Sequence, residues 1–190
     1  MSEPILLPGD SAIVALGGDT IIVRRARLTM KSVVLVPAAS GECEPEEEDE
    51  AQCVELQRDP VTVDLPLAGS AATVFTARAP ADSYAETHIG IGPDAGRGPA
   101  IQLEGVWSRT GVKRGFVYVA ALDEIEELEL APALLLPAQG AAQLTLRLDL
   151  ATWFLTANRA ALVDPGSANP GGPNEILVRD NIRMSIRASP

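Results

Sequence analysis

The sequence is poor in the side chains that most catalytic and metal centres use. Its 190 residues include one histidine, His88, and two cysteines, Cys43 and Cys53. Zinc sites built from cysteine and histidine are four-coordinate as a rule, so three such side chains nearly exclude one. The chain also lacks a Gly-x-Ser-x-Gly nucleophile elbow and a P-loop. We therefore expect a protein that is not an enzyme.

Long apolar runs are missing as well. No stretch approaches the roughly 18 apolar residues of a membrane helix, and Ile5-Leu6-Leu7 near the start is too short for the apolar core of a signal peptide. The sequence predicts a chain that is soluble as given, without a transmembrane segment. If the protein is exported, we expect that its targeting segment has been removed.

Positive charge is scarce, and lysine occurs only at Lys31 and Lys113. The net charge is −11, and seven of the negative charges fall between Glu42 and Glu50, which leaves −11 + 7 = −4 for the rest. The densest basic group, Arg24, Arg25 and Arg27, lies in a predicted strand and not in a basic arm. These features argue against binding to nucleic acid or to an anionic membrane surface.

Aromatic residues make up only 4% of the chain. Tyr84, Trp107, Trp153 and Phe154 could form a platform on which a sugar stacks. Because so few aromatic side chains are present, we favour the alternative that each of them anchors the core.

Glycine and proline are abundant and spread along the chain, as an all-β protein requires for its chain reversals. Apolar and polar residues alternate with a period of two in several segments. Strands are expected at Ser11–Leu16, from Thr20 to Val36 with a bulge near Ser32, and at 61–67, 72–79, 84–91, 101–107, 115–121, 124–130, 144–150 and 184–186. Asn174–Ile182 reads as a helix that Asn174 caps.

This pattern predicts an antiparallel β-sandwich of about eight to nine strands with one short C-terminal helix. Residues 1–18 are expected to form an N-terminal lead or edge strand. Residues 19–190 are expected to form a single sandwich domain, with an acidic loop at 38–52.

The two cysteines lie ten positions apart, on either side of that acidic loop. If the flanking strands bring them together, Cys43 and Cys53 form a disulfide, which is typical of an oxidising compartment. Two free thiols are the alternative. We favour the disulfide.

Calcium is the one cofactor that the sequence could support. Glu46, Glu47, Glu48, Asp49 and Glu50 supply many carboxylates, and calcium takes six to eight oxygen ligands. The run lacks the D-x-[DN]-x-[DN]-G spacing, however, so a solvated acidic loop is the favoured interpretation. A second, weaker set of oxygens consists of Asp164, Asn169 and Asn174.

His88 is predicted on the polar face of its strand, together with Glu86 and Tyr84. A catalytic role would need a nucleophile and an orienting acid that meet it in space. A solvated strand residue is the favoured interpretation.

Two stretches resemble a family of bacterial secreted lipoproteins of unknown function with a transthyretin-like or carboxypeptidase-regulatory-like β-sandwich. The first contains Val63-Asp64-Leu65-Pro66-Leu67 and Ala79-Pro80-Ala81-Asp82-Ser83-Tyr84, with Asp82 where that family has glycine. The second runs from Leu144 to the closing strand through Trp153-Phe154 and Asp164-Pro165. The resemblance implies export, often with a lipid-anchored cysteine that this chain lacks, and it brings no catalytic residues.

The sequence leaves the ligand, the partner and the oligomeric state open. The favoured hypothesis is a non-enzymatic, extracytoplasmic binding or structural module of the bacterial cell envelope, periplasmic, attached to the outer membrane or secreted. One alternative is a subunit of a surface filament or layer that self-assembles into a homo-oligomer through its sheet edges. Another is a calcium-binding module.

Overall fold

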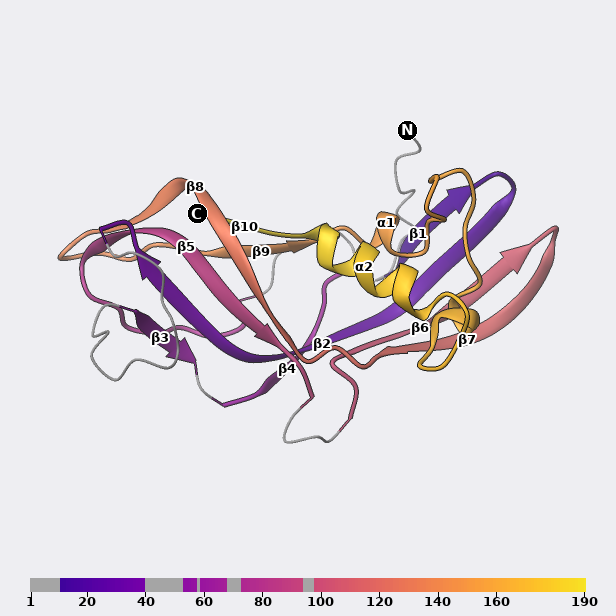
Figure 1. Ribbon diagram of the computed structural model, residues 1–190, viewed down its shortest axis with the longest axis horizontal. Helices are drawn as coiled ribbons and strands as arrows, with labels where there is room; N and C mark the ends of the chain where they lie inside the picture. Colours follow the sequence, from indigo (N-terminus) through magenta and orange to yellow (C-terminus); the bar gives the residue numbers. More distant parts are fainter. Residues whose placement is uncertain (1–10, 40–52, 58, 68–72, 94–97) are drawn as a thin grey trace.

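The computed structural model describes residues 11–39, 53–57, 59–67, 73–93 and 98–190. Figure 1 shows the elements that these residues form. In chain order they are β1 (Ala12–Leu16), β2 (Asp19–Pro37), β3 (Val54–Gln57), β4 (Val61–Asp64), β5 (Asp82–Ile91), β6 (Ile101–Arg109), β7 (Val112–Ala120), β8 (Glu124–Leu136), β9 (Thr145–Leu148), α1 (Leu150–Trp153), the 3-10 helix η1 (Pro165–Ala168), α2 (Glu175–Ser185) and β10 (Ile186–Ser189).

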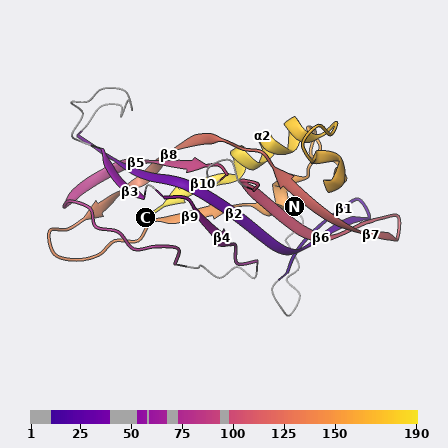
Figure 2. The ribbon, with the colours of Figure 1, turned by 90° about the horizontal axis from the view of Figure 1, so that it is seen from below.

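The long strand β2 organises the large sheet, which has eight strands that pair antiparallel. Figure 2 shows β2 running along the sheet with β5 and β8 toward one end and β6 and β7 toward the other. Met30 pairs with Val61 of β4 and with Ile91 of β5, while Leu28 pairs with Val63 of β4 and with Ile101 of β6. Since β4 lies on one edge of β2, β5 and β6 follow each other along the opposite edge.

Bulges keep one face of β2 apolar along its whole length. The register shifts between Val23 and Arg25 and again between Met30 and Ser32. Each extra residue reverses the alternation, so the buried side chains change parity twice. They are Ile21 and Val23, then Ala26, Leu28 and Met30, then Val33 and Leu35. The bulge predicted near Ser32 is confirmed, and the one near Arg24 was not predicted.

A second layer packs on this apolar face. It consists of the small β9–β10 sheet and the helices α1, η1 and α2. The main core cluster joins side chains from β1, β2, β6 and β7 with Trp153, Phe154, Val178 and Ile182 from the helical segment. A smaller cluster of Leu35, Tyr84, Leu130 and Leu134 lies at the other end of β2.

The predicted all-β, antiparallel class is confirmed. The layer opposite the large sheet contains two strands and three short helices, so the two layers are unequal. The predicted helix is α2, which extends to Ser185. Its predicted cap is wrong in one respect, because the Asn174 side chain makes no cap bond and its Nδ2 donates instead to Ser167 Oγ at 2.8 Å.

The strand predicted at 72–79 is wrong for the described residues, since 73–80 are irregular and Ala72 lies outside the described part of the chain. β4 and β5 lie on opposite edges of β2, and the described part of the segment that joins them pairs with neither edge. The predicted leucine strand at 144–150 is also shorter, because β9 ends at Leu148 and Leu150 begins α1.

No helix in the described residues is long and apolar enough to span a membrane.

Candidate functional site: the edge of β7

Strand β7 lies at the end of the large sheet and, among the described residues, pairs with β6 alone. The two strands meet at a two-residue turn, Thr110-Gly111, with positive φ at both residues (48° and 82°), which is the geometry that joins tight hairpins. In such a hairpin Arg109 and Val112 exchange backbone hydrogen bonds, and every second residue of β7 after Val112 does the same. The backbone groups of Lys113, Gly115, Val117 and Val119 therefore point away from the sheet.

A side chain from the second layer closes part of this free edge. Asn169, which follows η1, donates through Nδ2 to the carbonyl of Val117 at 3.0 Å and accepts through Oδ1 from the N–H of Val119 at 2.8 Å. These are the two groups that a neighbouring strand would engage, so the amide of Asn169 stands in for a peptide bond of such a strand. The bonds also confirm which residues of β7 point outward.

The remainder of the edge has no partner in the described part of the chain. The N–H and carbonyl groups of Lys113 and Gly115 and the N–H of Val117 point outward and make no hydrogen bond there. We call the segment from Lys113 to Val117 the open edge. Five free backbone groups in a row are enough to receive a short extended strand.

Gly105 and Gly115 of the hairpin differ in how much space a Cβ atom would have. A Cβ on Gly105 would come within 2.0 Å of the Ile22 carbonyl oxygen and 2.9 Å of the Phe116 ring, so the fold itself requires glycine there. A Cβ on Gly115 would meet nothing closer than 4.0 Å. Glycine inside a strand weakens the strand and often marks a close approach of another backbone. Packing within the described residues therefore does not explain Gly115.

An open hollow lies on each side of the hairpin at this point. The two have volumes of about 290 and 380 Å³, near the lower limit of small-molecule pockets, and both open to solvent. Both are bounded by Gly115, Phe116 and Val117; the first is completed by Trp107, Arg114, Asp164 and Gly166, and the second by Arg24, Glu104 and Gly105. Such hollows suit side chains that alternate on either side of an added strand better than one enclosed ligand.

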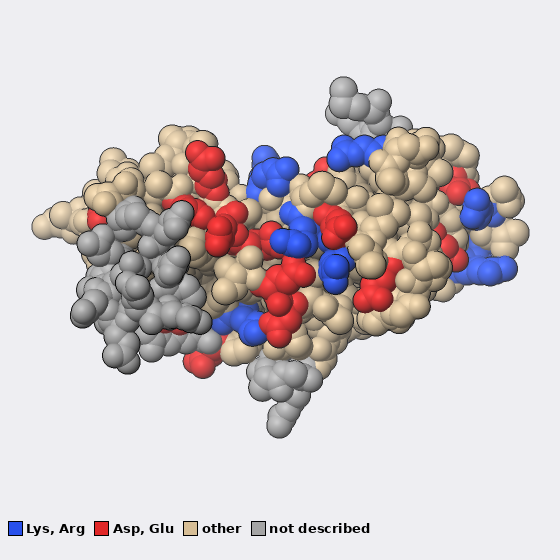
Figure 3. All heavy atoms as spheres, viewed as in Figure 1, with Lys and Arg blue, Asp and Glu red and all other residues tan. Residues whose placement is uncertain are grey.

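The hairpin is basic although the protein is acidic. The hairpin, residues 101–120, contains Arg109, Lys113 and Arg114 and one acidic residue, Glu104, whereas the whole chain carries −11. Figure 3 shows basic side chains at the end of the molecule where Figure 1 places the β6–β7 turn. Arg109 Nε lies 3.7 Å from the carboxylate of Asp19. Lys113 and Arg114 form no ion pair in the described part of the molecule.

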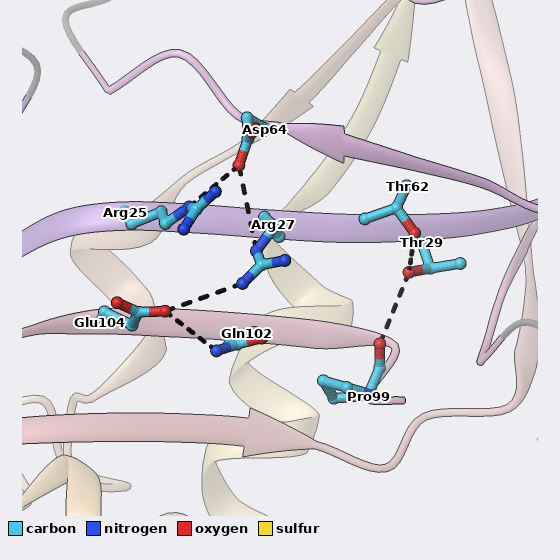
Figure 4. Close-up of polar contacts among 8 residues, drawn as sticks. All are labelled: Arg25, Arg27, Thr29, Thr62, Asp64, Pro99, Gln102 and Glu104. Carbon is cyan, nitrogen blue, oxygen red and sulfur yellow. Dashed lines mark hydrogen bonds and ion pairs between the residues drawn. The ribbon is translucent and has the colours of Figure 1, made fainter. Parts of the chain in front are cut away.

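A second polar group spans β4, β2 and β6, and Figure 4 shows that its members pair with one another. Asp64 accepts from Arg25 Nε at 3.3 Å, and Glu104 lies 3.8 Å from Arg27 Nη2 and accepts from Gln102 Nε2 at 3.0 Å. Exposed pairs of this kind contribute about 0–1 kcal/mol each. Since their charges are balanced, we assign this group to holding neighbouring strands together and not to binding.

The site residues predicted from the sequence fall mostly outside the described residues. Cys53 is described, directly before β3, but Cys43 is not, so the disulfide stays a prediction. All five proposed calcium ligands, Glu46, Glu47, Glu48, Asp49 and Glu50, lie outside the described residues, and calcium binding stays a prediction too. Within the described ranges, no cluster of three or more His, Cys, Asp or Glu side chains could hold a metal ion.

The weaker oxygen set of Asp164, Asn169 and Asn174 serves the fold. Asp164 Oδ1 accepts from the N–H of Gly166 at 2.8 Å and caps η1. Asn169 bonds to β7, and Asn174 bonds to Ser167. Each side chain thus fixes the loop between α1 and α2, and the three do not converge on one point.

His88 lies on β5 with its Nε2 3.2 Å from Glu86 Oε1. In the described residues this carboxylate is the only hydrogen-bond partner of the ring. Tyr84, predicted on the same face, is instead fully buried in the smaller cluster, and its hydroxyl donates to the Pro80 carbonyl at 2.9 Å. A register shift between Tyr84 and Glu86 separates it from the other two residues.

All four aromatic residues considered for sugar stacking are buried, so the prediction that they anchor the core is confirmed. Phe154 packs edge-on against Tyr118 with the ring centroids 5.2 Å apart. Burial, reinforced by the negative charge of Glu175, raises the pKa of the Tyr118 hydroxyl.

Comparison with protein-family models, with curated proteins and with solved structures gives no match to this chain. The open edge must therefore be interpreted from its own geometry and charge. The sequence predicted the strands at 101–107 and 115–121, but it did not single out Lys113, Gly115 or Val117, because which backbone groups of a strand remain free depends on its neighbours. The signal available was a glycine beside two cations in an alternating strand.

Proposed function

We propose that this protein is a non-catalytic binding module of the bacterial cell envelope, and that it receives an extended polypeptide segment along the open edge of β7. The observation that carries the proposal is the row of outward backbone groups at Lys113, Gly115 and Val117. In strand addition, main-chain hydrogen bonds supply affinity, and side-chain hollows next to the edge supply specificity. Both are found together on this hairpin.

Hydrogen exchange measured residue by residue tests the mode of binding. The probe is a panel of short synthetic peptides rich in threonine and valine, with glutamate, glutamine or lysine pairs at the centre. On addition of a binding peptide, the amides of Lys113, Gly115 and Val117 should gain protection, because their N–H groups acquire acceptors. The amides of Arg114 and Phe116 already bond to β6 and should change little. Protection that does not alternate, or that lies elsewhere, would contradict strand addition.

Two substitutions of Gly115 give the matching mutational test. Gly115→Pro removes an outward N–H without removing a hydrogen bond of the β6–β7 ladder. Gly115→Ala keeps that N–H and fills only open space. We expect the proline variant to lose peptide binding and the alanine variant to retain it. Circular dichroism and thermal unfolding establish that both variants fold, and equal peptide affinity for two folded variants would sink the proposal.

The extracytoplasmic location rests on the cysteine pair and on the family resemblance. It predicts that Cys43 and Cys53 are joined in the protein isolated from its native compartment. Thiol labelling of the denatured, unreduced protein should then find no free thiol, and labelling after reduction should find two. Two reactive thiols before reduction would remove this support.

Self-assembly through sheet edges is the second candidate. The apolar lead Ile5–Leu16 is the segment that would add a strand to a neighbouring copy, but its part Ala12–Leu16 is already paired with β2 of the same chain. Size-exclusion chromatography with and without residues 1–10, a truncation that leaves β1 in place, tests this alternative, and a monomer in both cases rejects it. The calcium alternative is tested by calorimetric titration with CaCl₂, since binding at the 42–50 run would release or absorb heat and raise the melting temperature.

A further inference from the structure

We infer that the segment received by the open edge is acidic, with two adjacent carboxylates that lie opposite Lys113 and Arg114. This inference rests on the proposed function and names the chemistry of its partner.

The two cations are available for a partner. Lys113 and Arg114 are exposed and form no ion pair within the described residues. Of the nearby acids, Asp19 pairs with Arg109 and Glu104 with Arg27, whereas Asp164, which lines the same hollow as Arg114, accepts from the N–H of Gly166 and forms no ion pair within the described residues. An unpaired cation therefore stands at two successive positions of the free edge.

The two cations lie on opposite faces of the sheet, because successive side chains of a strand alternate. Phe116 and Tyr118 are buried against the second layer, so Arg114 shares their face and lines the hollow with Trp107. Lys113 shares the other face with Val117, whose side chain is 53% exposed. Two consecutive acidic residues of an added strand would also alternate, so one would meet Lys113 and its neighbour would meet Arg114.

The same charges oppose pairing with an identical edge. Two copies of β7 placed side by side would bring four cations together with no acidic residue between 105 and 122 of either chain. Charged residues on an edge strand are a known defence against such pairing. These charges therefore disfavour pairing of the open edge with its own copy and favour a segment of opposite charge.

The decisive measurement is a comparison of three matched peptides by fluorescence anisotropy against the full chain. The peptides share a threonine–valine sequence and differ only in a central pair, which is Glu-Glu, Gln-Gln or Lys-Lys. Two exposed cross-strand ion pairs should make the Glu-Glu peptide bind about fivefold more tightly than the Gln-Gln peptide. This preference should shrink as NaCl rises, whereas the affinity for Gln-Gln should change little.

Variants assign the preference to the two cations. In the double variant Lys113→Gln with Arg114→Gln, the Glu-Glu and Gln-Gln peptides should bind equally well. With Lys113→Glu and Arg114→Glu, the order should reverse in favour of Lys-Lys. The matched control is Arg78→Gln with Arg147→Gln, which removes two exposed cations elsewhere and should leave the preference intact.

The possible failures can be told apart. If the peptides bind and protect Lys113, Gly115 and Val117 but show no charge preference, the acidic partner is wrong and strand addition stands. If the preference survives in the double glutamine variant, the cations responsible lie elsewhere and the inference is overturned. If no peptide of the panel binds at all, the cations only protect the edge, and the proposed function falls together with the inference.

Discussion

Two buried hydrogen bonds in series join the helices α1 and α2. Trp153 Nε1 donates to Ser185 Oγ at 2.8 Å, and Ser185 Oγ donates to the Ile182 carbonyl at 2.6 Å. Trp153 is fully buried, so its N–H has no access to water. These hydrogen bonds join α1 to the end of α2. If the acceptor were lost, the buried Trp153 N–H would be left unpaired, which is costly.

Ser185→Ala is therefore expected to lower the free energy of unfolding by about 1–3 kcal/mol, because it leaves the Trp153 N–H buried without an acceptor. Urea denaturation followed by tryptophan fluorescence measures the change. Ser189→Ala, in β10, is the control and should change the free energy by less than about 0.5 kcal/mol. Equal effects of the two substitutions would contradict the assigned hydrogen bond.

The burial of Tyr118 makes the stability of the fold depend on pH in the alkaline range. Burial raises the pKa of Tyr118 above its ordinary value near 10. The folded state therefore retains the phenolic proton at pH values where the unfolded chain has lost it, so the stability that this group provides is complete below pH 10 and is lost as the pH rises above 10. Tyr118→Phe should remove that loss, because phenylalanine does not ionise. Denaturation at pH 8 and at pH 11 compares the two proteins, and an identical decline in both would contradict the prediction.

At the scale of elements, the β6–β7 hairpin contains Gly105, where the fold requires glycine, and Gly115, where packing does not. Gly105→Ala should destabilise the fold by about 2–3 kcal/mol, because its Cβ would overlap the backbone oxygen of Ile22. Gly115→Ala should be neutral or stabilising by up to about 1 kcal/mol, because alanine fits and restricts the unfolded chain. Thermal unfolding of this matched pair tests the prediction, which fails if Gly115→Ala is the more damaging change.

The bond between Asn169 and β7 gives a second test at this scale. Asn169→Asp keeps the acceptor for the Val119 N–H but replaces the donor to the Val117 carbonyl by a carboxylate oxygen, so we expect a loss of about 1–2 kcal/mol. The control is Asn158→Asp, since Asn158 Oδ1 only accepts, from Thr156 and Ala160, and aspartate can do the same. Chemical denaturation of both variants should separate them, and equal stability would mean that the edge does not depend on the Asn169 amide.

At the scale of the whole molecule, β2 makes the large sheet and both core clusters one unit. Strands from both ends of the chain pack on it or on its neighbours, and β1 contributes Ala12 and Val14 to the main cluster. The N-terminal segment is thus part of the sheet from residue 12 onward. We expect unfolding in a single cooperative transition.

Val14→Asp should lower the melting temperature of that single transition, because it places a carboxylate in the core. The expected loss in the free energy of unfolding is about 2 kcal/mol or more. Ala15→Asp is the matched control, since Ala15 is exposed on the same strand, and it should have little effect. Differential scanning calorimetry distinguishes a shifted single peak from two separate peaks. Two peaks, with only the smaller one shifted, would show that β1 folds as an independent lead.

The sequence by itself determined the local features of this protein. Alternation with a period of two predicted strands at most of the positions where they occur, among them both strands of the β6–β7 hairpin, and the stretch after Asn174 predicted α2. Each of these signals depends on interactions between residues close in the chain, and it is therefore visible without the partner elements.

Only the tertiary structure decided which strand edges are free and which polar side chains are engaged. The segment from 73 to 80, between β4 and β5 on opposite edges of β2, pairs with no strand in the described residues, although its sequence predicted one at 72–79. That Asn169 reaches β7 from about 50 positions away closed half of an edge and left Lys113 to Val117 open. Backbone hydrogen bonds between strands join residues far apart in sequence, so the open edge has no local signature beyond Gly115 and its two cationic neighbours.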